Sequence, residues 1–325
     1  MTFTDELKDA ISRRTVLLVL GVLAVQIAFI ASYVGAFHQP TPHEIDIAVV
    51  GPDQVVQQLD DSLELSASAM TEAEARAQIE RGELAGALVV DTSGTQDTLL
   101  TATARGSSLA TALQSVVEQA DAQQGRTVAV QDLVPLEEGD ARGMSGFYLV
   151  IGWLVGGYLV ASLLGVAKGA RPANRRRAAI RLGAMVPYAV ASGLTGALVV
   201  DQGLGALTGH YWAIAGVGTL LVLASATVTM ALQVLFGTIG IGLTVLLFVV
   251  LGNPSAGGAY QLELLPGLWR GIGEWLPNGA GTTALREIVY FGGHGAAGHL
   301  WLIVAYAVVG AAVTLAASAA IRRRD

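Results

Sequence analysis

Long apolar stretches separated by polar segments dominate this chain of 325 residues. Four stretches without a formal charge are long enough to cross a membrane as helices, which rise about 1.5 Å per residue. They are Thr15–Phe37, Gly143–Ala167, Leu182–Val200 and Leu300–Ile321. A fifth stretch, Tyr211–Leu251, has about twice the length of one span and predicts a hairpin that turns near Gln233–Gly237. The pattern predicts an α-helical polytopic membrane protein with six transmembrane helices.

Lys and Arg residues gather at the ends of these spans, and such residues are enriched on the cytoplasmic side of a membrane. The three clusters are Lys8, Arg13 and Arg14 before the first span, Lys168, Arg171, Arg175, Arg176, Arg177 and Arg181 between the second and third, and Arg322, Arg323 and Arg324 after the last. Six crossings place all three clusters on one side. We therefore expect a multi-pass protein of the plasma (inner) membrane, with both termini cytoplasmic and residues 38–142 extracytoplasmic.

The N-terminal segment, residues 1–14, carries Phe3, Leu7 and Ile11 on one helical face. This spacing is typical of an amphipathic helix that lies along a lipid surface. The segment predicts contact with the inner leaflet of the bilayer.

Residues 38–142 form the one long polar segment, and strand patterns alternate with helix patterns along it. Strands are expected at Ile45–Val50, Ala85–Val90, Thr98–Thr103 and Thr127–Val134, and helices from a Thr71 cap to Gly82 and over Ser107–Ala122. Such alternation in about 100 residues favours a small α/β domain. The sequence thus predicts an α/β domain inserted between the first two spans.

The link before the last span, about 264–291, is unusually apolar and predicts two short interfacial or re-entrant helices, the first starting at Pro266 and the second capped by Thr282 or Thr283. Its candidate gate residues are Pro266, Trp269, Arg270, Glu274, Trp275, Arg286 and Glu287. Arg270 with Glu274 and Arg286 with Glu287 favour local pairing at the membrane surface over contact with a substrate.

Charge is scarce and unevenly placed: 53% of the residues are hydrophobic, 14% are charged and the formal net charge is −7. The segment 38–142 carries 18 acids and 5 bases, so it repels phosphate and argues against a nucleic-acid partner. The spans contain no acid or base near their centres, which disfavours a proton-coupled carrier. Cysteine is absent, which excludes disulfides and thiolate chemistry.

Glycine is abundant, with 40 residues. Gly152 and Gly156 form a Gly-x-x-x-Gly motif in the second span, which permits close helix contact. We favour packing within the subunit as its role, and a dimer seam is the alternative.

No catalytic constellation is evident, and we predict that the chain is not an enzyme. A P-loop motif is missing, so ATP would be hydrolysed on a partner and no cofactor is expected in this chain. The run Gly143-Met144-Ser145-Gly146 is similar to the nucleophile region of rhomboid proteases, with His294 or His299 as base, but four residues in a glycine-rich chain are a weak signal. The two histidines lack further ligands for a metal.

The residues from Leu251-Gly252-Asn253-Pro254 through Leu264-Leu265-Pro266 and Trp275-Leu276-Pro277 to Ala284-Leu285-Arg286-Glu287 resemble the phage-infection-protein (YhgE/Pip) group. Ile47-Ala48-Val49-Val50 and the run from Ile79 to Leu88 resemble the outer domains of related proteins. This group is similar to the type-2 ABC exporter permeases, whose plan is one span, a large outer domain and five spans.

The resemblance implies a half-transporter that pairs with a second six-span subunit, as a homodimer or heterodimer, and with a separate ATP-binding subunit. The basic loop from Lys168 to Arg181 is in the position of the family's coupling element, although topology and lipid contact also explain its charge. We expect export of an amphipathic or lipid-like substrate. The alternative is an ATPase-independent surface receptor, or a secretion or assembly component, that acts through the outer domain.

Overall fold

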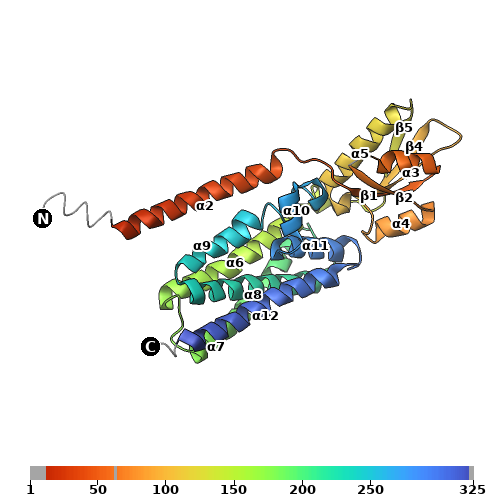
Figure 1. The fold of residues 1–325 in the computed structure, drawn as a ribbon. Coiled ribbons are helices and arrows are strands. Elements are labelled where there is room, and N and C mark those ends of the chain that lie inside the picture. The colour runs from red at the N-terminus through yellow and green to blue at the C-terminus, as the bar shows by residue number, and fades with distance from the viewer. Residues whose placement is uncertain (1–11, 62–63, 322–325) are drawn as a thin grey trace.

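A computed structural model describes residues 12–61 and 64–321 and shows a helical bundle joined end-on to a small domain that contains a sheet (Figure 1). The first part of the chain forms α2 (Arg13–Phe37), β1 (Ile45–Val50), α3 (Asp53–Asp60), β2 (Leu65–Ala69), α4 (Glu72–Glu80), β3 (Gly86–Val89), β4 (Gln96–Thr101), η1 (Thr103–Arg105), α5 (Ser107–Ala122), β5 (Thr127–Asp132) and η2 (Glu138–Asp140). The second part forms α6 (Ser145–Lys168), α7 (Arg175–Leu198), η3 (Val199–Gly203), α8 (Tyr211–Phe236), α9 (Ile239–Val245), η4 (Leu246–Leu251), η5 (Leu262–Leu264), α10 (Gly267–Gly273), α11 (Pro277–Tyr290) and α12 (Ala296–Ile321).

The sheet domain, residues 38–142, contains one mixed sheet in the order β2-β1-β3-β4-β5. The β3–β4 pair is antiparallel, and the other neighbours are parallel. Its core is formed by side chains such as Ile47, Leu88 and Leu99, all nearly fully buried. Because strands buried on both faces read as continuous apolar runs, the sequence could locate β1 and β3.

The capped helix predicted after Thr71 is confirmed: Thr71 and Glu74 form a reciprocal capping box at the start of α4. The helix expected over Ser107–Ala122 is also confirmed as α5. Two elements were missed, α3 and β2. β2 reads Leu-Ser-Ala-Ser-Ala and lies at the edge of the sheet, so it lacks the apolar run that marks a central strand.

Five helices in the described residues are long and apolar enough to cross a membrane: Thr15–Phe37, Ser145–Lys168, Arg175–Gly203, Tyr211–Phe236 and Ala296–Ala320. α8 is the central helix and packs against α6, α7 and α12. Glycines allow this close approach, because a Cβ on Gly310 of α12 would lie 2.7 Å from the Thr227 backbone of α8. We call the end of this bundle that meets the sheet domain the proximal end, and the other the distal end.

The sixth predicted span is not confirmed as a full-length helix. The hairpin turn is present, since α8 ends at Gly237 with a φ of 65°. The returning helix, α9 with the π-helical η4, covers only Ile239–Leu251, about 20 Å at 1.5 Å per residue. Asn278 completes this region by donating from Nδ2 to the Phe248 carbonyl (2.9 Å) and to Asn253 Oδ1 (2.8 Å). A buried amide thus satisfies backbone that the shortened helix leaves open.

The short helices α10 and α11 lie at the proximal end of the bundle (Figure 1). The first starts after Pro266, as predicted. The second starts at Pro277, five residues before the predicted cap, and its first half is buried against the bundle. The predicted capping role of Thr282 is therefore wrong, because its hydroxyl lies inside the helix and donates to the Asn278 carbonyl (2.9 Å). Proline at the first helical position explains the earlier start.

α2 runs beside the bundle, with most of its apolar side chains exposed (Figure 1). Its proximal end is fixed by Trp269 of α10, whose indole N–H donates to Ser32 Oγ (3.1 Å). The same indole lies against Gly35, where a Cβ would be 2.7 Å from the ring. The predicted amphipathic segment with Phe3, Leu7 and Ile11 and the arginines at 322–324 lie outside the described residues.

Candidate functional site

The sheet domain is joined to the bundle by the chain segment that leads into α10. Leu264 of this segment is buried in the core of the sheet domain. At the start of α5, the Leu109 N–H donates to Gln261 Oε1 (3.0 Å) and the Ser108 hydroxyl donates to the Ala259 carbonyl (2.9 Å). Because an N-terminal helix N–H needs an acceptor, Gln261 caps α5 from the bundle side. The two parts of the protein therefore share one continuous junction.

A charged cavity of about 620 Å³ lies in this junction. Ten of its lining residues carry titratable side chains: Arg81, Glu83, Arg105, Glu263, Arg270, Glu274, Arg286, Glu287, His294 and His299. They come from the loop after α4, from η1, from the segment before α10, and from α10, α11 and the start of α12. The spans of the bundle are nearly free of charge, whereas this cavity gathers ionisable side chains from both parts of the protein. Such convergence of ionisable groups in a cavity marks a candidate site.

Three of the four arginines in the charged cavity have acidic partners. Arg81 pairs with Glu83 at 2.8 Å, Arg105 with Glu263 at 3.2 Å, and Arg270 with Glu44 at 3.8 Å. Arg105 also donates to the Gly82 carbonyl. These contacts link the sheet domain to the segment before α10 and to α10.

Of the local pairs predicted within the link, neither Arg270 with Glu274 nor Arg286 with Glu287 lies at ion-pair distance in the described residues, although Arg286 and Glu287 attract each other electrostatically. α10 ends at Gly273, so Glu274 lies past its last turn and is exposed. Arg286 instead donates from Nη2 to the Gly257 carbonyl (3.0 Å).

Glu287 is the carboxyl group with the most altered environment in the charged cavity. Burial raises the pKa of Glu287 to about 7, although Arg286 and Arg105 act in the opposite direction. Its Oε1 lies 3.7 Å from His299 Nε2, and its Oε2 has no hydrogen-bond partner among the described residues. The group can therefore gain or lose a proton near neutral pH.

Asp140 ties the end of α11 to the start of α6. The Tyr290 hydroxyl donates to Asp140 Oδ2 (3.0 Å), and the Ser145 N–H donates to Oδ1 (2.8 Å). Burial first, and then the Asp140 charge, raise the pKa of Tyr290. Ser145 thus begins a helix here, and it is not among the residues that line the cavity with His294 and His299.

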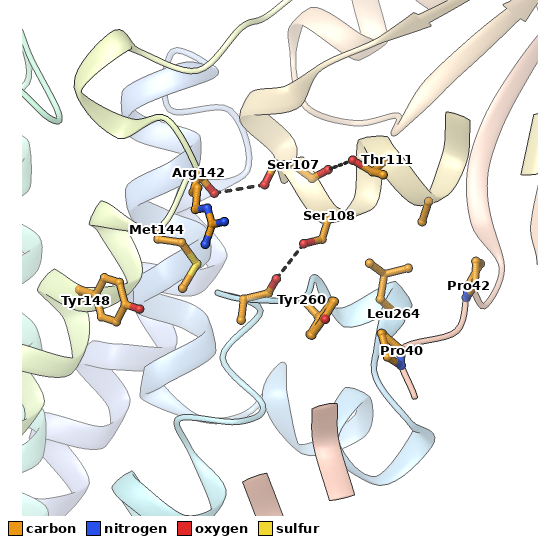
Figure 2. Close-up of a pocket in the computed structure, with 12 residues that line it drawn as sticks. Pro40, Pro42, Ser107, Ser108, Thr111, Arg142, Met144, Tyr148, Tyr260 and Leu264 are labelled. Carbon is orange, nitrogen blue, oxygen red and sulfur yellow. Dashed lines mark hydrogen bonds between the residues drawn. The ribbon is translucent and has the colours of Figure 1, made fainter. Parts of the chain in front are cut away.

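A second cavity, of about 660 Å³, lies between the start of α5 and the start of α6 (Figure 2). Ser107, Ser108 and Thr111 of α5 face Arg142 and Tyr148 across it. Pro40, Pro42, Met144, Tyr260 and Leu264 supply apolar walls. The hydroxyl groups at the start of α5 are engaged by the protein itself, because Ser107 donates to the Arg142 carbonyl (3.2 Å). We call this space the serine cavity.

Aromatic side chains mark the level of the proximal end relative to a membrane. Trp275, Trp301 and Trp212 are 69%, 72% and 77% exposed, and each lies next to or in the first turns of a proximal helix. Exposed tryptophan is enriched at membrane–water interfaces. Of the predicted interfacial residues, Trp275 has this exposed position, whereas Trp269 faces α2 and Pro266 caps α10.

The basic loop at the distal end divides into two groups. Arg181 donates to the Lys168 and Gly169 carbonyls (2.8 and 2.9 Å), and Arg171 donates to the Val234 and Leu235 carbonyls (3.1 and 3.2 Å). These two arginines cap the ends of α6 and α8. The other four, Lys168, Arg175, Arg176 and Arg177, are exposed.

Gly152 and Gly156 do not form the close contact within the subunit that we favoured. A Cβ on Gly152 would meet nothing within 4 Å, and one on Gly156 would meet only the Tyr188 hydroxyl, at 3.2 Å. Gly157, the neighbouring glycine, is the one that packs against α8. The face of α6 is therefore open at Gly152, whereas Tyr188 of α7 contacts Gly156.

The sheet domain contains a pair of neighbouring acids, Asp97 and Asp121, that the sequence analysis did not predict. Arg126 donates to both oxygens of Asp97, with Nε at 2.6 Å from Oδ2. Burial alone would raise the pKa of Asp97, but the hydrogen bonds from Arg126 and from the Asp91 N–H lower it. Burial and then the charge of Asp97 raise the pKa of the neighbouring Asp121 to about 6. Sequence separation hid this cluster, because the three groups lie on β4, α5 and the start of β5.

Arg81, Glu83, Arg105 and Glu263 are site residues that the sequence reasoning missed. A signal was present: Arg81-Gly82-Glu83 interrupts the end of a helix with a glycine, and Gly82 has a φ of 74°. Arg105 and Glu263, however, pair across 158 positions of the chain.

Comparison of the chain with protein-family models, curated proteins and solved structures gave no match. Within residues 12–61 and 64–321, no group of three or more His, Cys, Asp or Glu side chains could hold a metal ion. The functional argument therefore depends on the geometry of the junction and of the bundle.

Proposed function

We propose that this protein is the permease subunit of an exporter in the plasma membrane, driven by a separate ATP-binding subunit. This proposal keeps the resemblance to the phage-infection-protein group and the type-2 ABC exporter permeases. It places both termini and the basic loop in the cytoplasm and the sheet domain outside. The distal end of the bundle is then cytoplasmic, and the proximal end faces outward.

The observation that carries the proposal is the position of α11. Its first half, from Pro277 to Thr282, is buried among α6, α8 and α12, whereas its C-terminal end reaches the sheet domain through Phe291. In the proposal, α11 acts as the outer gate, because it enters the bundle from the proximal end. A movement of the sheet domain would be transmitted to it directly.

The short helix α9–η4 fits a sixth crossing that is completed by irregular chain. Asn253 and Ser255, which follow η4, are buried in the protein. Non-helical backbone is tolerated at membrane depth where protein covers it. In the proposal, residues 252–255 extend the path of α9 and η4 to the outer surface, and α12 then returns to the cytoplasm.

The exposed cations at the distal end supply a contact surface for the ATP-binding subunit. Arg175, Arg176 and Arg177 form the first turn of α7 and make no ion pair within the described residues. Cationic side chains are unfavourable at a helix N-terminus. The presence of three arginines in this first turn therefore supports an external anionic partner, either protein or lipid.

The cargo proposed is amphipathic or lipid-like, because the helices that would line a path are almost free of charge. The open face of α6 at Gly152 supports pairing with a second six-span subunit. The uncharged helices and the open position at Gly152 are both compatible with a cargo that is not a soluble ion.

The test is purification of the tagged, full-length protein from its native membrane under mild detergent. We expect a stoichiometric subunit with a P-loop motif and ATPase activity that changes when amphipathic lipids are added. A variant without the first turn of cations, Arg175→Ala with Arg176→Ala and Arg177→Ala, should lose that subunit. If the wild-type protein brings down no ATPase, the exporter proposal fails and the surface-receptor alternative gains support.

A further inference from the structure

We infer that the charged cavity is a binding site for a phosphate group, with Arg286 as its anchor. The inference rests on the proposed function only in one respect, namely that the bound phosphate would belong to the exported molecule. Binding itself requires no transport and no ATPase.

The first argument is the unsatisfied state of Arg286. A guanidinium has five N–H donors, and Arg286 uses one, to the Gly257 carbonyl. In the described ranges it has no carboxylate partner within ion-pair distance, unlike Arg81, Arg105 and Arg270. Burial lowers the pKa of Arg286, with Glu263 acting in the opposite direction. Arg286 is partly buried and attracted by carboxylates that lie beyond ion-pair distance; a partly buried cation without a direct counter-ion is costly, and an anion in the cavity would lower that cost.

The second argument concerns the chemistry of the anion. Arg105 lies close enough to Arg286 for the two cations to repel each other, and an anion between them would relieve this repulsion. Neutral Glu287 can donate a hydrogen bond to an oxygen, and His294 and His299 also line the cavity. A phosphate accepts hydrogen bonds on several oxygens from several directions, whereas a carboxylate offers two oxygens in one plane. The number of converging donors favours phosphate.

The third argument is depth. The cavity is formed by the same proximal segment that carries the exposed Trp275 and Trp301, the residues that mark the membrane interface. Lipid phosphates lie at this level of a bilayer. The cavity volume of about 620 Å³ leaves room for a headgroup larger than phosphate itself. A lipid phosphate and a free phosphate share the chemistry, and the experiment below separates them.

Binding of phosphatidylglycerol, a phosphodiester whose charge stays constant over this range, should weaken as pH rises from 6 to 8, because Glu287 loses its proton and then repels the anion. The charged groups that face Glu287 come from every element around the cavity: Arg286 on α11, His299 on α12, His294 before it, Arg105 on η1, Arg81 and Glu83 after α4, Glu263 before α10, and Arg270 and Glu274 at α10. Glu287→Gln isolates the carboxyl contribution.

The experiment measures binding to the purified full-length protein in uncharged detergent by calorimetry at pH 6 and pH 8. The probes are inorganic phosphate, dihexanoyl-phosphatidylglycerol below its micelle concentration, and dihexanoyl-glycerol, which lacks the phosphate. We expect the phospholipid to bind and the glycerol lipid not to bind. Binding of inorganic phosphate with equal affinity would identify a free phosphate as the source and would still support the site. Binding of neither phosphate probe would overturn it.

Arg286→Gln should reduce affinity at least tenfold, and the matched control Arg142→Gln, which removes an exposed guanidinium from the serine cavity, should leave it unchanged. Equal losses in both variants, or none in either, would overturn the inference. Should Arg286→Gln not fold, Glu287→Gln decides: tighter binding at pH 8 and a flatter pH profile support the site, and an unchanged profile contradicts it. Binding without export would leave the site intact and remove only the proposed function.

Discussion

Phe291 of the α11 end lies directly against Gly82 of the sheet domain. A Cβ built on Gly82 would be 2.9 Å from Cγ of the phenyl ring, and Phe291 is buried in the same cluster as Ile79 and Leu100. The ring therefore belongs to the core of the sheet domain, although it is attached to the helix that enters the bundle. In the proposed exporter, this contact is where motion of one part reaches the other.

Replacing Gly82 with alanine should separate these two parts. The added methyl would clash with Phe291, and the backbone φ of 74° is unfavourable for alanine. We expect a loss of about 2–3 kcal/mol in stability, measured by urea unfolding of the full-length protein and by faster proteolysis between residues 250 and 300. Gly125→Ala is the control, because Gly125 has a φ of 68° but nothing within 4 Å. Equal effects of the two variants would contradict the contact.

Asn278→Ala should destabilise the proximal end of the bundle. The side-chain amide donates to the Phe248 carbonyl and to Asn253, and all three groups are buried. Leaving these acceptors unsatisfied costs about 1–3 kcal/mol, which thermal unfolding in detergent would detect. Asn174→Ala, which removes an exposed helix cap, should cost about 1 kcal/mol. A smaller effect at Asn278 than at Asn174 would argue against the role given to Asn278.

Asp121→Asn should make the sheet domain more stable at pH 8 and change little at pH 4. The pKa of Asp121 is raised to about 6 in the folded protein, against about 3.9 in an unfolded chain. Stability contributed by the neutral carboxyl is therefore fully present below about pH 4 and is lost as pH rises through 6. The expected gain at pH 8 is on the order of 2 kcal/mol, read from urea midpoints. Glu118→Gln, which replaces an exposed carboxyl group on the same helix, is the control; a gain at Asp121 that is equal at both pH values would refute the assignment.

Two arginines at the distal end should differ in their effect on stability. Arg181→Ala removes two hydrogen bonds to the C-terminal carbonyls of α6 and should lower stability by about 1–2 kcal/mol. Arg176→Ala touches an exposed side chain and should change stability by less than about 0.5 kcal/mol, while weakening association with an ATP-binding subunit. The measurements are thermal unfolding and co-purification. Loss of stability at Arg176 would contradict this division.

Single cysteines can test the orientation cleanly, because the natural chain has none. Ser93→Cys lies on the surface of the sheet domain and Ala173→Cys lies in the distal loop. A membrane-impermeant maleimide should label the first in intact cells and the second only after permeabilisation. Labelling of Ala173→Cys in intact cells would reverse the proposed topology.

Local patterns were enough for much of the fold. The capping box of Thr71 and Glu74 is decided by neighbouring residues, and the sequence predicted the helix that it begins. The sequence did not predict β2 or α3, because an edge strand of small residues and a short polar helix carry weak local signals. The candidate site was only half visible: Arg270, Glu274, Arg286 and Glu287 were selected, but their partners were misassigned.

The sequence by itself determined where apolar helices form, where the sheet domain is inserted and where charge is absent, because hydrophobic period and charge spacing act over a few turns. Only the tertiary structure decided that the sixth predicted span is a helix of 13 residues, completed by Asn278 from another segment. It also decided that Arg105 meets Glu263, 158 positions away, while Arg286 forms no ion pair within the described ranges, although Glu263 and Glu287 attract it. Ion pairs and buried amides are selected by proximity in space, and a linear pattern does not record which distant segments the packing of α11 brings together.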